Sequence, residues 1–168
     1  MVFRKAVEND LDSIYGLIKQ AREYFRQNGI DQWQDNYPNP DIVMEDIKNE
    51  ECYVVENDDG IIATVVLSFR GEKSYDKIYE GKWLSDNDYA VIHRIAVDSR
   101  HKGKRISSFI VSRLEDMCLE KNVFSIRVDT HRDNKSMLKM LSNNGYTYCG
   151  IIYLETGSER LAFEKILK

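Results

Sequence analysis

The sequence contains little of several residue types, and each shortage excludes a class of protein. Only 2 prolines and 9 glycines occur in 168 residues, so a collagen-like chain or a proline-rich linker is excluded. No apolar run approaches the length of a membrane span, and the N-terminus lacks the apolar core of a signal peptide. These absences predict a cytoplasmic protein with no membrane contact.

Cysteine is also scarce, and its number is odd. Cys52, Cys118 and Cys149 are widely spaced and lie in apolar or helical contexts. This spacing argues against a disulfide framework and against a zinc site. We expect buried, reduced thiols and no metal.

An excess of positive charge is absent as well, because the formal net charge is −4. A general affinity for polyanions is therefore not expected, and a dedicated nucleic-acid binder is disfavoured. The chain is 42% apolar and 31% charged, which is ordinary for an enzyme-sized domain. Its length predicts one domain, spanning residues 1–168, with a core of its own.

Apolar periodicity predicts an alternation of strands and helices along the chain. The first helix is expected to have Asn9 or Asp10 as its cap and to stop at Gly29. Strands are expected over 2–7, 51–56, 61–69, 89–97, 124–130, 146–154 and 160–166, and helices over 9–28, 41–49, 106–121 and from 134 onward. This order favours an α/β fold with a mixed sheet and helices on both faces.

The most informative segment is a strand, a basic turn and a helix in succession. An apolar run ends at Val97, the turn Lys102-Gly103-Lys104-Arg105 follows, and helical periodicity begins at Ile106. Free backbone N–H groups and the positive end of a helix dipole would meet basic side chains there. The segment predicts a site for a phosphorylated ligand.

This turn resembles the pyrophosphate-binding signature of the GNAT superfamily of acetyl-CoA-dependent N-acetyltransferases, Arg/Gln-x-x-Gly-x-Gly/Ala. Here it reads Lys102-Gly103-Lys104-Arg105-Ile106-Ser107, with Arg105 in place of the middle glycine. A later element, Asn134 followed by Asn144-Gly145-Tyr146, is similar to the "N…GF" element of the family. The resemblance covers nearly the whole chain and implies a mostly antiparallel sheet of six to seven strands.

The resemblance implies a set of residues that hold acetyl-CoA. The strand before the turn would pair with the pantetheine arm, the turn would hold the pyrophosphate, and Asn134 would also reach the pantetheine. Lys139 could approach the adenosine phosphates. The implied contacts are Ile95, Ala96, Val97, Lys102, Gly103, Lys104, Arg105, Ile106, Ser107, Ser108, Asn134 and Lys139.

Proton transfer in such a site needs a base and, in many relatives, an acid. His93 matches a base position on the strand, shares a face with Ile95 by alternation, and has a suitable ordinary pKa of about 6.5; a structural histidine is the alternative. Arg94, on the opposite face, is expected to anchor a helix or loop. The tyrosine that usually protonates the thiolate is replaced by Leu141. Two alternatives remain for this step. Tyr146 or Tyr148 could supply the proton, or the thiolate leaves without an acid because a thiol of pKa near 8.5 leaves readily.

The acceptor is expected near the loop that follows the first helix. Trp33 and Tyr24 offer aromatic walls for an amine, although Trp33 could equally plug the core. Tyr89 and His131 complete the predicted acceptor residues. The polar segment 71–88 is long enough to be a functional loop, with Trp83 as a lid residue or a packing anchor.

Together these patterns predict an N-acetyltransferase that moves an acetyl group from acetyl-CoA to a primary amine of a small molecule, peptide or protein. The chain would act as a monomer or homodimer. Two alternatives remain at this point. One is a non-catalytic acyl-CoA-binding or sensor domain, and the other is a module whose basic turn grips an acidic protein partner.

Overall fold

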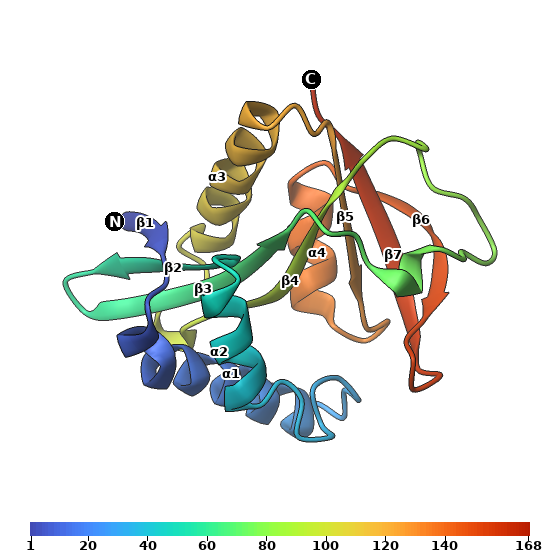
Figure 1. The fold of residues 1–168 in the computed structure, drawn as a ribbon. Coiled ribbons are helices and arrows are strands. Elements are labelled where there is room, and N and C mark those ends of the chain that lie inside the picture. The colour runs from blue at the N-terminus through green and yellow to red at the C-terminus, as the bar shows by residue number, and fades with distance from the viewer. The chain divides into compact units, whose positions relative to one another are not determined.

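The computed structural model describes residues 1–168, and the order of its elements is shown in Figure 1. Its contacts divide the chain into two compact units. Unit 1 comprises residues 1–67 and 93–110, and unit 2 comprises residues 68–92 and 111–168. The single domain expected from the length stays a prediction.

Seven strands and four α-helices make up the chain, close to the expected positions. The strands are β1 (Val2–Lys5), β2 (Cys52–Asn57), β3 (Gly60–Ser68), β4 (Ala90–Val97), β5 (Ser125–Thr130), β6 (Thr147–Tyr153) and β7 (Glu159–Ile166). The helices are α1 (Leu11–Gln27), α2 (Pro40–Lys48), α3 (Ile106–Glu120) and α4 (Lys135–Asn143). Every predicted strand and helix is present, with ends that differ by a few residues.

The strands form one seven-stranded sheet in the order β1-β2-β3-β4-β5-β7-β6. β1 pairs antiparallel with β2, β2 with β3, β5 with β7, and β6 with β7. β4 and β5 pair in parallel, at Ala90 with Ile126 and at Val91 with Arg127. The predicted fold class, a mixed and mostly antiparallel sheet with helices, is confirmed.

Unit 1 builds its core between α1, α2 and the first strands. Apolar residues of α1 and α2 pack with residues of β2 and β3, among them Ile14, Ile18, Val43, Val54 and Val66. Gly29 ends α1 with a φ of +66°, a left-handed conformation that glycine adopts without strain. The helix end predicted at Gly29 is therefore confirmed.

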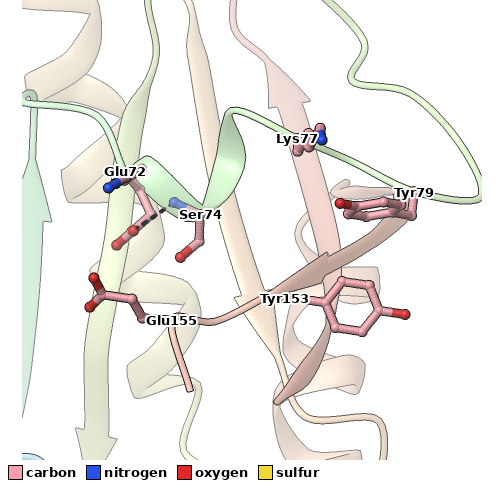
Figure 2. A pocket seen from close by; sticks show the side chains of 7 residues that line it. Glu72, Ser74, Lys77, Tyr79, Tyr153 and Glu155 are labelled. Atoms are coloured by element: carbon pink, nitrogen blue, oxygen red, sulfur yellow. Dashed lines mark hydrogen bonds between the residues drawn. The ribbon is translucent and has the colours of Figure 1, made fainter. Parts of the chain in front are cut away.

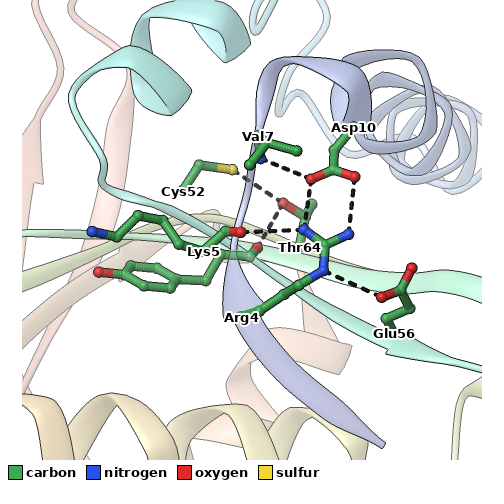
Figure 3. Close-up of polar contacts among 8 residues, drawn as sticks. Arg4, Lys5, Val7, Asp10, Cys52, Glu56 and Thr64 are labelled. Atoms are coloured by element: carbon green, nitrogen blue, oxygen red, sulfur yellow. Dashed lines mark hydrogen bonds and ion pairs between the residues drawn. The ribbon is translucent and has the colours of Figure 1, made fainter.

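The start of α1 differs from the prediction. Asp10 stands at the N-cap position, but its carboxylate makes no capping bond to the helix. It accepts hydrogen bonds from the Val7 N–H at 2.8 Å and from both terminal nitrogens of Arg4. Figure 3 shows the Arg4 guanidinium between Asp10 and Glu56. The Asp10 carboxylate, which the sequence predicted as a cap of α1, is therefore paired with Arg4 of β1 instead.

Unit 2 contains the segment 71–88, which we call the insert, and anchors it through a buried ion pair. Glu164 of β7 is fully buried and accepts hydrogen bonds from the Leu84 N–H and the Ser85 hydroxyl of the insert. Arg127 of β5 lies 3.4 Å from this carboxylate and donates to the Ser85 carbonyl. Two buried charges of the sheet thus fix the middle of the insert.

Trp83 is a packing anchor of the insert. Its indole N–H donates to the Tyr75 carbonyl at 3.0 Å. The guanidinium of Arg127 lies 4.2 Å from the Trp83 ring and 4.1 Å from the Tyr89 ring. These contacts enclose the arginine between two aromatic rings. Of the two roles that the sequence left open, the structure supports packing.

The insert also extends the edge of the sheet beside β6. Tyr79 forms an antiparallel bridge with Ile151, with hydrogen bonds of 2.8 Å in both directions. The backbones come so close that a Cβ added at Gly81 would lie 1.9 Å from the Cys149 carbonyl oxygen. At Gly150 an added Cβ would lie 2.6 Å from the Tyr79 carbonyl oxygen. These two glycines permit the insert to cover the edge strand.

The three cysteines are buried free thiols, as the sequence predicted. Burial raises the pKa of Cys52 to about 11 and that of Cys118 to about 12, so both thiols stay protonated and unreactive. No helix combines the length and the apolar character that a membrane span requires.

Candidate active site

The part of β4 in unit 1 contains a break in the strand geometry at Arg94, whose φ is +49°. The strict alternation expected from Tyr89 to Val97 is therefore interrupted between His93 and Ile95. His93, Ile95 and Val97 are partly buried, and Ala96 is buried. Ile95, Ala96 and Val97, which were expected to pair with the pantetheine arm, follow the break directly.

Arg94 anchors both a helix and a loop, as predicted. Its Nε and Nη2 each lie 2.7 Å from a carboxylate oxygen of Asp46 in α2. Its Nη1 donates to the Tyr37 hydroxyl at 2.6 Å. The Arg94 and Asp46 side chains are only 14% and 8% exposed, so the pair is partly desolvated and bidentate. This ion pair fixes α2 and the loop before it to the irregular point of β4.

The loop at residues 31–39 is held by a second arginine. Arg22 of α1 donates to the Trp33 carbonyl at 3.0 Å and to the Pro38 carbonyl. The Trp33 ring packs edge-on against Phe25, with centroids 5.5 Å apart, and lies against the core of unit 1. The side chain of Trp33 is therefore used at least in part for packing, the alternative that the sequence left open.

The basic turn keeps a left-handed conformation at two residues. Gly103 has a φ of +80° and Arg105 a φ of +60°. Residues 102–105 are all exposed, and α3 begins at the next residue, Ile106. Arg105 thus adopts the backbone conformation that the glycine of the family signature would provide. The side chain at position 105 is therefore accommodated in a left-handed conformation.

The turn places three cations ahead of a helix N-terminus. Lys102, Lys104 and Arg105 are exposed, and the first N–H groups of a helix have no intrahelical partner. The Lys102 ammonium lies 4.4 Å from the ring centroid of Tyr24. The structure thus brings one predicted cofactor residue and one predicted acceptor residue together. Such a turn can bind an anion through backbone and side chains.

In unit 2, Asn134 caps α4, as its place before a helix predicted. Its side-chain oxygen accepts the Met137 N–H at 3.2 Å, and the residue is buried. The nearby His131 accepts the Asp133 N–H on Nδ1 at 3.0 Å. Lys139 is exposed on the same helix. Capping accounts for Asn134 without requiring a ligand.

The residue in place of the usual tyrosine, Leu141, is fully buried. Tyr146 is buried too, its hydroxyl has no hydrogen-bond partner, and burial raises its pKa. Tyr148 is 50% exposed, and its ring packs against Phe163. Of these three residues, only Tyr148 has a phenol side chain that is exposed to solvent.

A carboxylate that the sequence reasoning did not single out lies at the end of β5. Asp129 accepts a hydrogen bond from the Tyr75 hydroxyl at 2.7 Å. Burial raises the pKa of Asp129, while Tyr75 and Arg160 oppose the shift. Tyr89, whose ring lies 6.2 Å from that of Tyr75, accepts the Glu72 N–H on its hydroxyl. Predicted acceptor residue Tyr89 and Asp129 therefore belong to one polar cluster.

A signal for this cluster exists in the strand itself. Ser125, Arg127 and Asp129 alternate with apolar residues along β5, which places them on one face. A strand face that is buried and yet charged needs partners from another segment. The sequence does not reveal that the insert supplies them.

A small pocket opens beside this cluster in unit 2. It has a volume of about 290 Å³ and lies between the insert and the turn that joins β6 to β7. Figure 2 shows Glu72, Ser74 and Glu155 on one side of it and Tyr79 with Tyr153 on the other. No group of three or more His, Cys, Asp or Glu side chains is arranged to hold a metal ion.

Comparison with known proteins identifies the family. The profile of the acetyltransferase (GNAT) family matches residues 14–146. A GNAT-family acetyltransferase structure from Streptococcus agalactiae 2603 is 35% identical with a TM-score of 0.87, covering 99% of this chain and 95% of its own. S-(2-succino)cysteine N-acetyltransferase of Bacillus subtilis is 27% identical over 170 residues, covering 99% and 96%.

A further relative and a further solved structure are similar to this chain. The uncharacterized N-acetyltransferase YesJ of Bacillus subtilis is 25% identical, covering 86% of this chain and 81% of its own. YncA of Salmonella typhimurium, a putative acetyltransferase whose structure contains its cofactor acetyl-CoA, is 13% identical with a TM-score of 0.71, covering 99% and 94%. At this identity, YncA shows the shared fold alone. The chain is an acyltransferase that belongs to the GNAT family of acetyltransferases.

Proposed function

We propose that this protein transfers the acetyl group of acetyl-CoA to a primary amine. The observation that carries the proposal is the φ of +60° at Arg105, next to +80° at Gly103. A turn of this shape exposes backbone N–H groups toward an anion, and three cations surround it. The turn therefore fits a pyrophosphate although a glycine of the family signature is missing.

Residues of several elements are proposed to hold the cofactor. Lys102, Gly103, Lys104, Arg105, Ile106, Ser107 and Ser108 are proposed for the pyrophosphate, and Ile95, Ala96 and Val97 for the pantetheine arm. Asn134 and Lys139 are proposed for further contacts with the pantetheine and the phosphates. Bound acetyl-CoA supplies an acetyl thioester, and the protein binds, orients and moves protons around it.

An acceptor amine must first lose a proton, because a lysine-like amine has a pKa of about 10.4. Two groups are proposed to receive it, His93 and Asp129, directly or through water. The amine nitrogen then forms a bond to the acetyl carbon, the carbon–sulfur bond breaks, and sulfur leaves with the electron pair. Burial makes Tyr146 a weak acid, so we propose that the thiolate leaves without an acid at Leu141 and takes its proton from solvent.

The acceptor is proposed to be a small molecule, a peptide or a protein amine. Tyr24, Trp33, Tyr89 and His131 are the proposed contacts. The name of one relative, S-(2-succino)cysteine N-acetyltransferase, adds amino-acid derivatives to the acceptors worth testing. That compound is a specific candidate for this chain.

Cofactor binding is tested by thermal denaturation with CoA, because a ligand that binds only the folded state stabilises it. At 100 times Kd the gain is about 2.7 kcal/mol, which raises the melting temperature by several degrees. Dephospho-CoA and ATP serve as comparison ligands. No shift with millimolar CoA, dephospho-CoA or ATP would refute the proposal. Catalysis is then measured as CoA thiol released from acetyl-CoA in the presence of an amine library.

A further inference from the structure

The segment of unit 1 between β4 and the basic turn contains a buried histidine. His101 is the last residue of the 3₁₀ turn Ser99–His101 and directly precedes Lys102. Its side chain is only 8% exposed, whereas residues 102–105 are all exposed. An ionisable group that is shielded from solvent therefore adjoins the residues proposed for the pyrophosphate.

The imidazole of His101 meets a carboxylate from a distant part of unit 1. Its Nε2 lies 3.3 Å from Oδ2 of Asp59, a residue of the turn between β2 and β3. The Asp59 N–H donates to the side-chain oxygen of Asn57 at 2.8 Å, which fixes this turn. A neutral imidazole has no charge, so the contact becomes an ion pair only when His101 is protonated.

The main chain of His101 belongs to the basic turn. Its carbonyl oxygen accepts the Lys104 N–H at 3.4 Å, and its N–H donates to the Asp98 carbonyl at 2.9 Å. The Asp98 N–H donates to the Ile62 carbonyl of β3 at 2.8 Å. His101 thus connects the basic turn to Asp59 through its ring and to β3 through the backbone.

The side chains of the basic turn make few contacts of their own. Lys102 lies over the Tyr24 ring, and Lys102, Lys104 and Arg105 form no ion pair within the chain. On the far side of the turn, the Arg105 carbonyl accepts the Phe109 N–H of α3 at 3.1 Å. The position of the turn therefore depends on the backbone at its two ends, and His101 forms one of them.

The other charged groups around His101 keep their charge near neutral pH. A hydrogen bond from the Arg100 side chain, with a smaller contribution from the charge of His101, lowers the pKa of Asp98 to about 2. From α1 comes an uncharged group, the side-chain oxygen of Gln20, which accepts the Ser99 N–H at 3.0 Å. Aspartate, arginine and lysine ordinarily titrate outside the range from about pH 5 to 8, whereas histidine titrates within it.

We propose that His101 is a positioning residue for the basic turn and that its protonation strengthens binding of the cofactor pyrophosphate. This inference rests on the proposed function and adds a dependence on pH to it. Protonated His101 pairs with Asp59, which holds the turn in place, and adds a fourth positive charge next to the three of the turn. Both effects favour bound phosphates. They are present below the pH at which His101 titrates and are lost as pH rises through it.

The test is calorimetric titration of the full chain with dephospho-CoA at several values between about pH 5.5 and pH 8. Dephospho-CoA keeps the pyrophosphate but lacks the phosphate monoester of CoA, whose own titration near pH 6 would add to the result. We expect the Kd of the wild type to be about three- to ten-fold lower at the acid end of this range. His101→Gln should lose this dependence, while His93 and His131 remain in place.

Two variants of the turn between β2 and β3 separate the ion pair from a general effect of charge. Asp59→Asn should shift the pH dependence of Kd toward lower pH, because an imidazole without a carboxylate beside it gives up its proton more easily. Asp58→Asn is the matched control, since it removes the same charge from an exposed neighbour that makes no contact with His101. Its profile should match that of the wild type.

A wild-type Kd that does not depend on pH, or a dependence that His101→Gln retains in full, would overturn the inference. So would identical profiles for Asp59→Asn and Asp58→Asn, a comparison that stays available if His101→Gln does not fold, because both aspartates are exposed. A protein that binds neither CoA nor dephospho-CoA at any of these pH values would instead refute the proposed function.

Discussion

Arg105 occupies a left-handed backbone conformation, with a φ of +60°, in which a side chain is strained by about 1–2 kcal/mol. Glycine avoids this strain but loses about 0.5–1 kcal/mol in chain entropy. We therefore expect Arg105→Gly to raise the free energy of unfolding by up to about 1 kcal/mol, measured by urea denaturation. The same variant should bind CoA about ten-fold more weakly and with a smaller dependence on salt, because one charge near the phosphates is lost.

Arg105→Lys is the matched control for this prediction. It keeps both the charge and the left-handed strain, so its stability and its salt dependence should remain close to those of the wild type. If Arg105→Gly binds CoA as tightly as the wild type at low salt, the guanidinium makes no contact with the phosphates.

Asp129 provides a second prediction at the scale of one residue. Burial raises its pKa in the folded protein, so the ionised carboxylate is unfavourable above that pKa. This free-energy cost of ionisation disappears as pH falls below the ordinary pKa of about 3.9, because Asp129 is then protonated in both the folded and the unfolded state. Asp129→Asn should therefore be more stable than the wild type at pH 7 and equal to it near pH 3, in urea denaturation at both pH values.

The same variant should lose acetyl transfer by about ten-fold or more, since an amide cannot accept a proton. His93→Gln tests the other proposed proton acceptor in the same assay. Tyr75→Phe is the companion to Asp129→Asn, because it removes the hydrogen bond that holds the pKa of Asp129 down. The acid limb of its rate profile should move to higher pH. An Asp129→Asn variant with full activity would remove Asp129 from the mechanism.

At the scale of elements, the insert depends on two close backbone contacts. A Cβ at Gly81 would lie 1.9 Å from the Cys149 carbonyl oxygen, and the backbone atoms cannot yield without separating the insert from β6. We expect Gly81→Ala to lower the free energy of unfolding by about 1–3 kcal/mol. Hydrogen exchange at residues 78–81 should accelerate, because the bridge between Tyr79 and Ile151 is lost.

Gly16→Ala is the control with the opposite sign. Gly16 lies inside α1, and nothing lies within 4 Å of an added Cβ. Alanine in a helix interior is favoured over glycine by about 0.5–1 kcal/mol, so this variant should be more stable than the wild type. Equal effects of the two substitutions would show that the contact with β6 does not anchor the insert.

At the scale of the whole molecule, neither compact unit is a continuous piece of chain. Residues 93–110 join unit 1 and residues 111–168 join unit 2, so β4 and α3 each contribute to both units. We expect one cooperative unfolding transition, because opening either unit would break two shared elements. Trp33 lies in unit 1 and Trp83 in unit 2, which gives each unit its own fluorescent probe.

Single-tryptophan variants make this expectation measurable. Trp33→Phe leaves Trp83 as the fluorescent reporter, and Trp83→Phe leaves Trp33. For each variant, the urea unfolding curve from tryptophan fluorescence should coincide with the curve from circular dichroism. Separate midpoints for the two probes of one variant would show that the units unfold independently and would contradict the single domain predicted from the length.

The sequence by itself determined the elements, the family and the basic turn. Local signals are sufficient for these features: apolar periodicity defines the strands and helices, Gly29 ends α1, and Asn134 caps α4 through a contact three residues away. The turn around Arg105 and the later element from Asn134 to Tyr146 together gave the GNAT resemblance, because each is a contiguous motif. Such interactions join residues that are close in the chain, so the sequence alone is enough to predict them.

Only the tertiary structure decided which side chains meet across the sheet. Tyr75 and Asp129 are 54 residues apart, and Leu84 and Glu164 are 80 apart, so no local pattern pairs them. The break at Arg94, which interrupts the alternation around His93, coincides with an ion pair to a distant partner, Asp46 in α2. Burial determines the protonation behaviour of Asp129, and burial is a property of the packed insert. The proposed role of Asp129 as a proton acceptor therefore emerged from long-range packing, which a one-dimensional pattern does not encode.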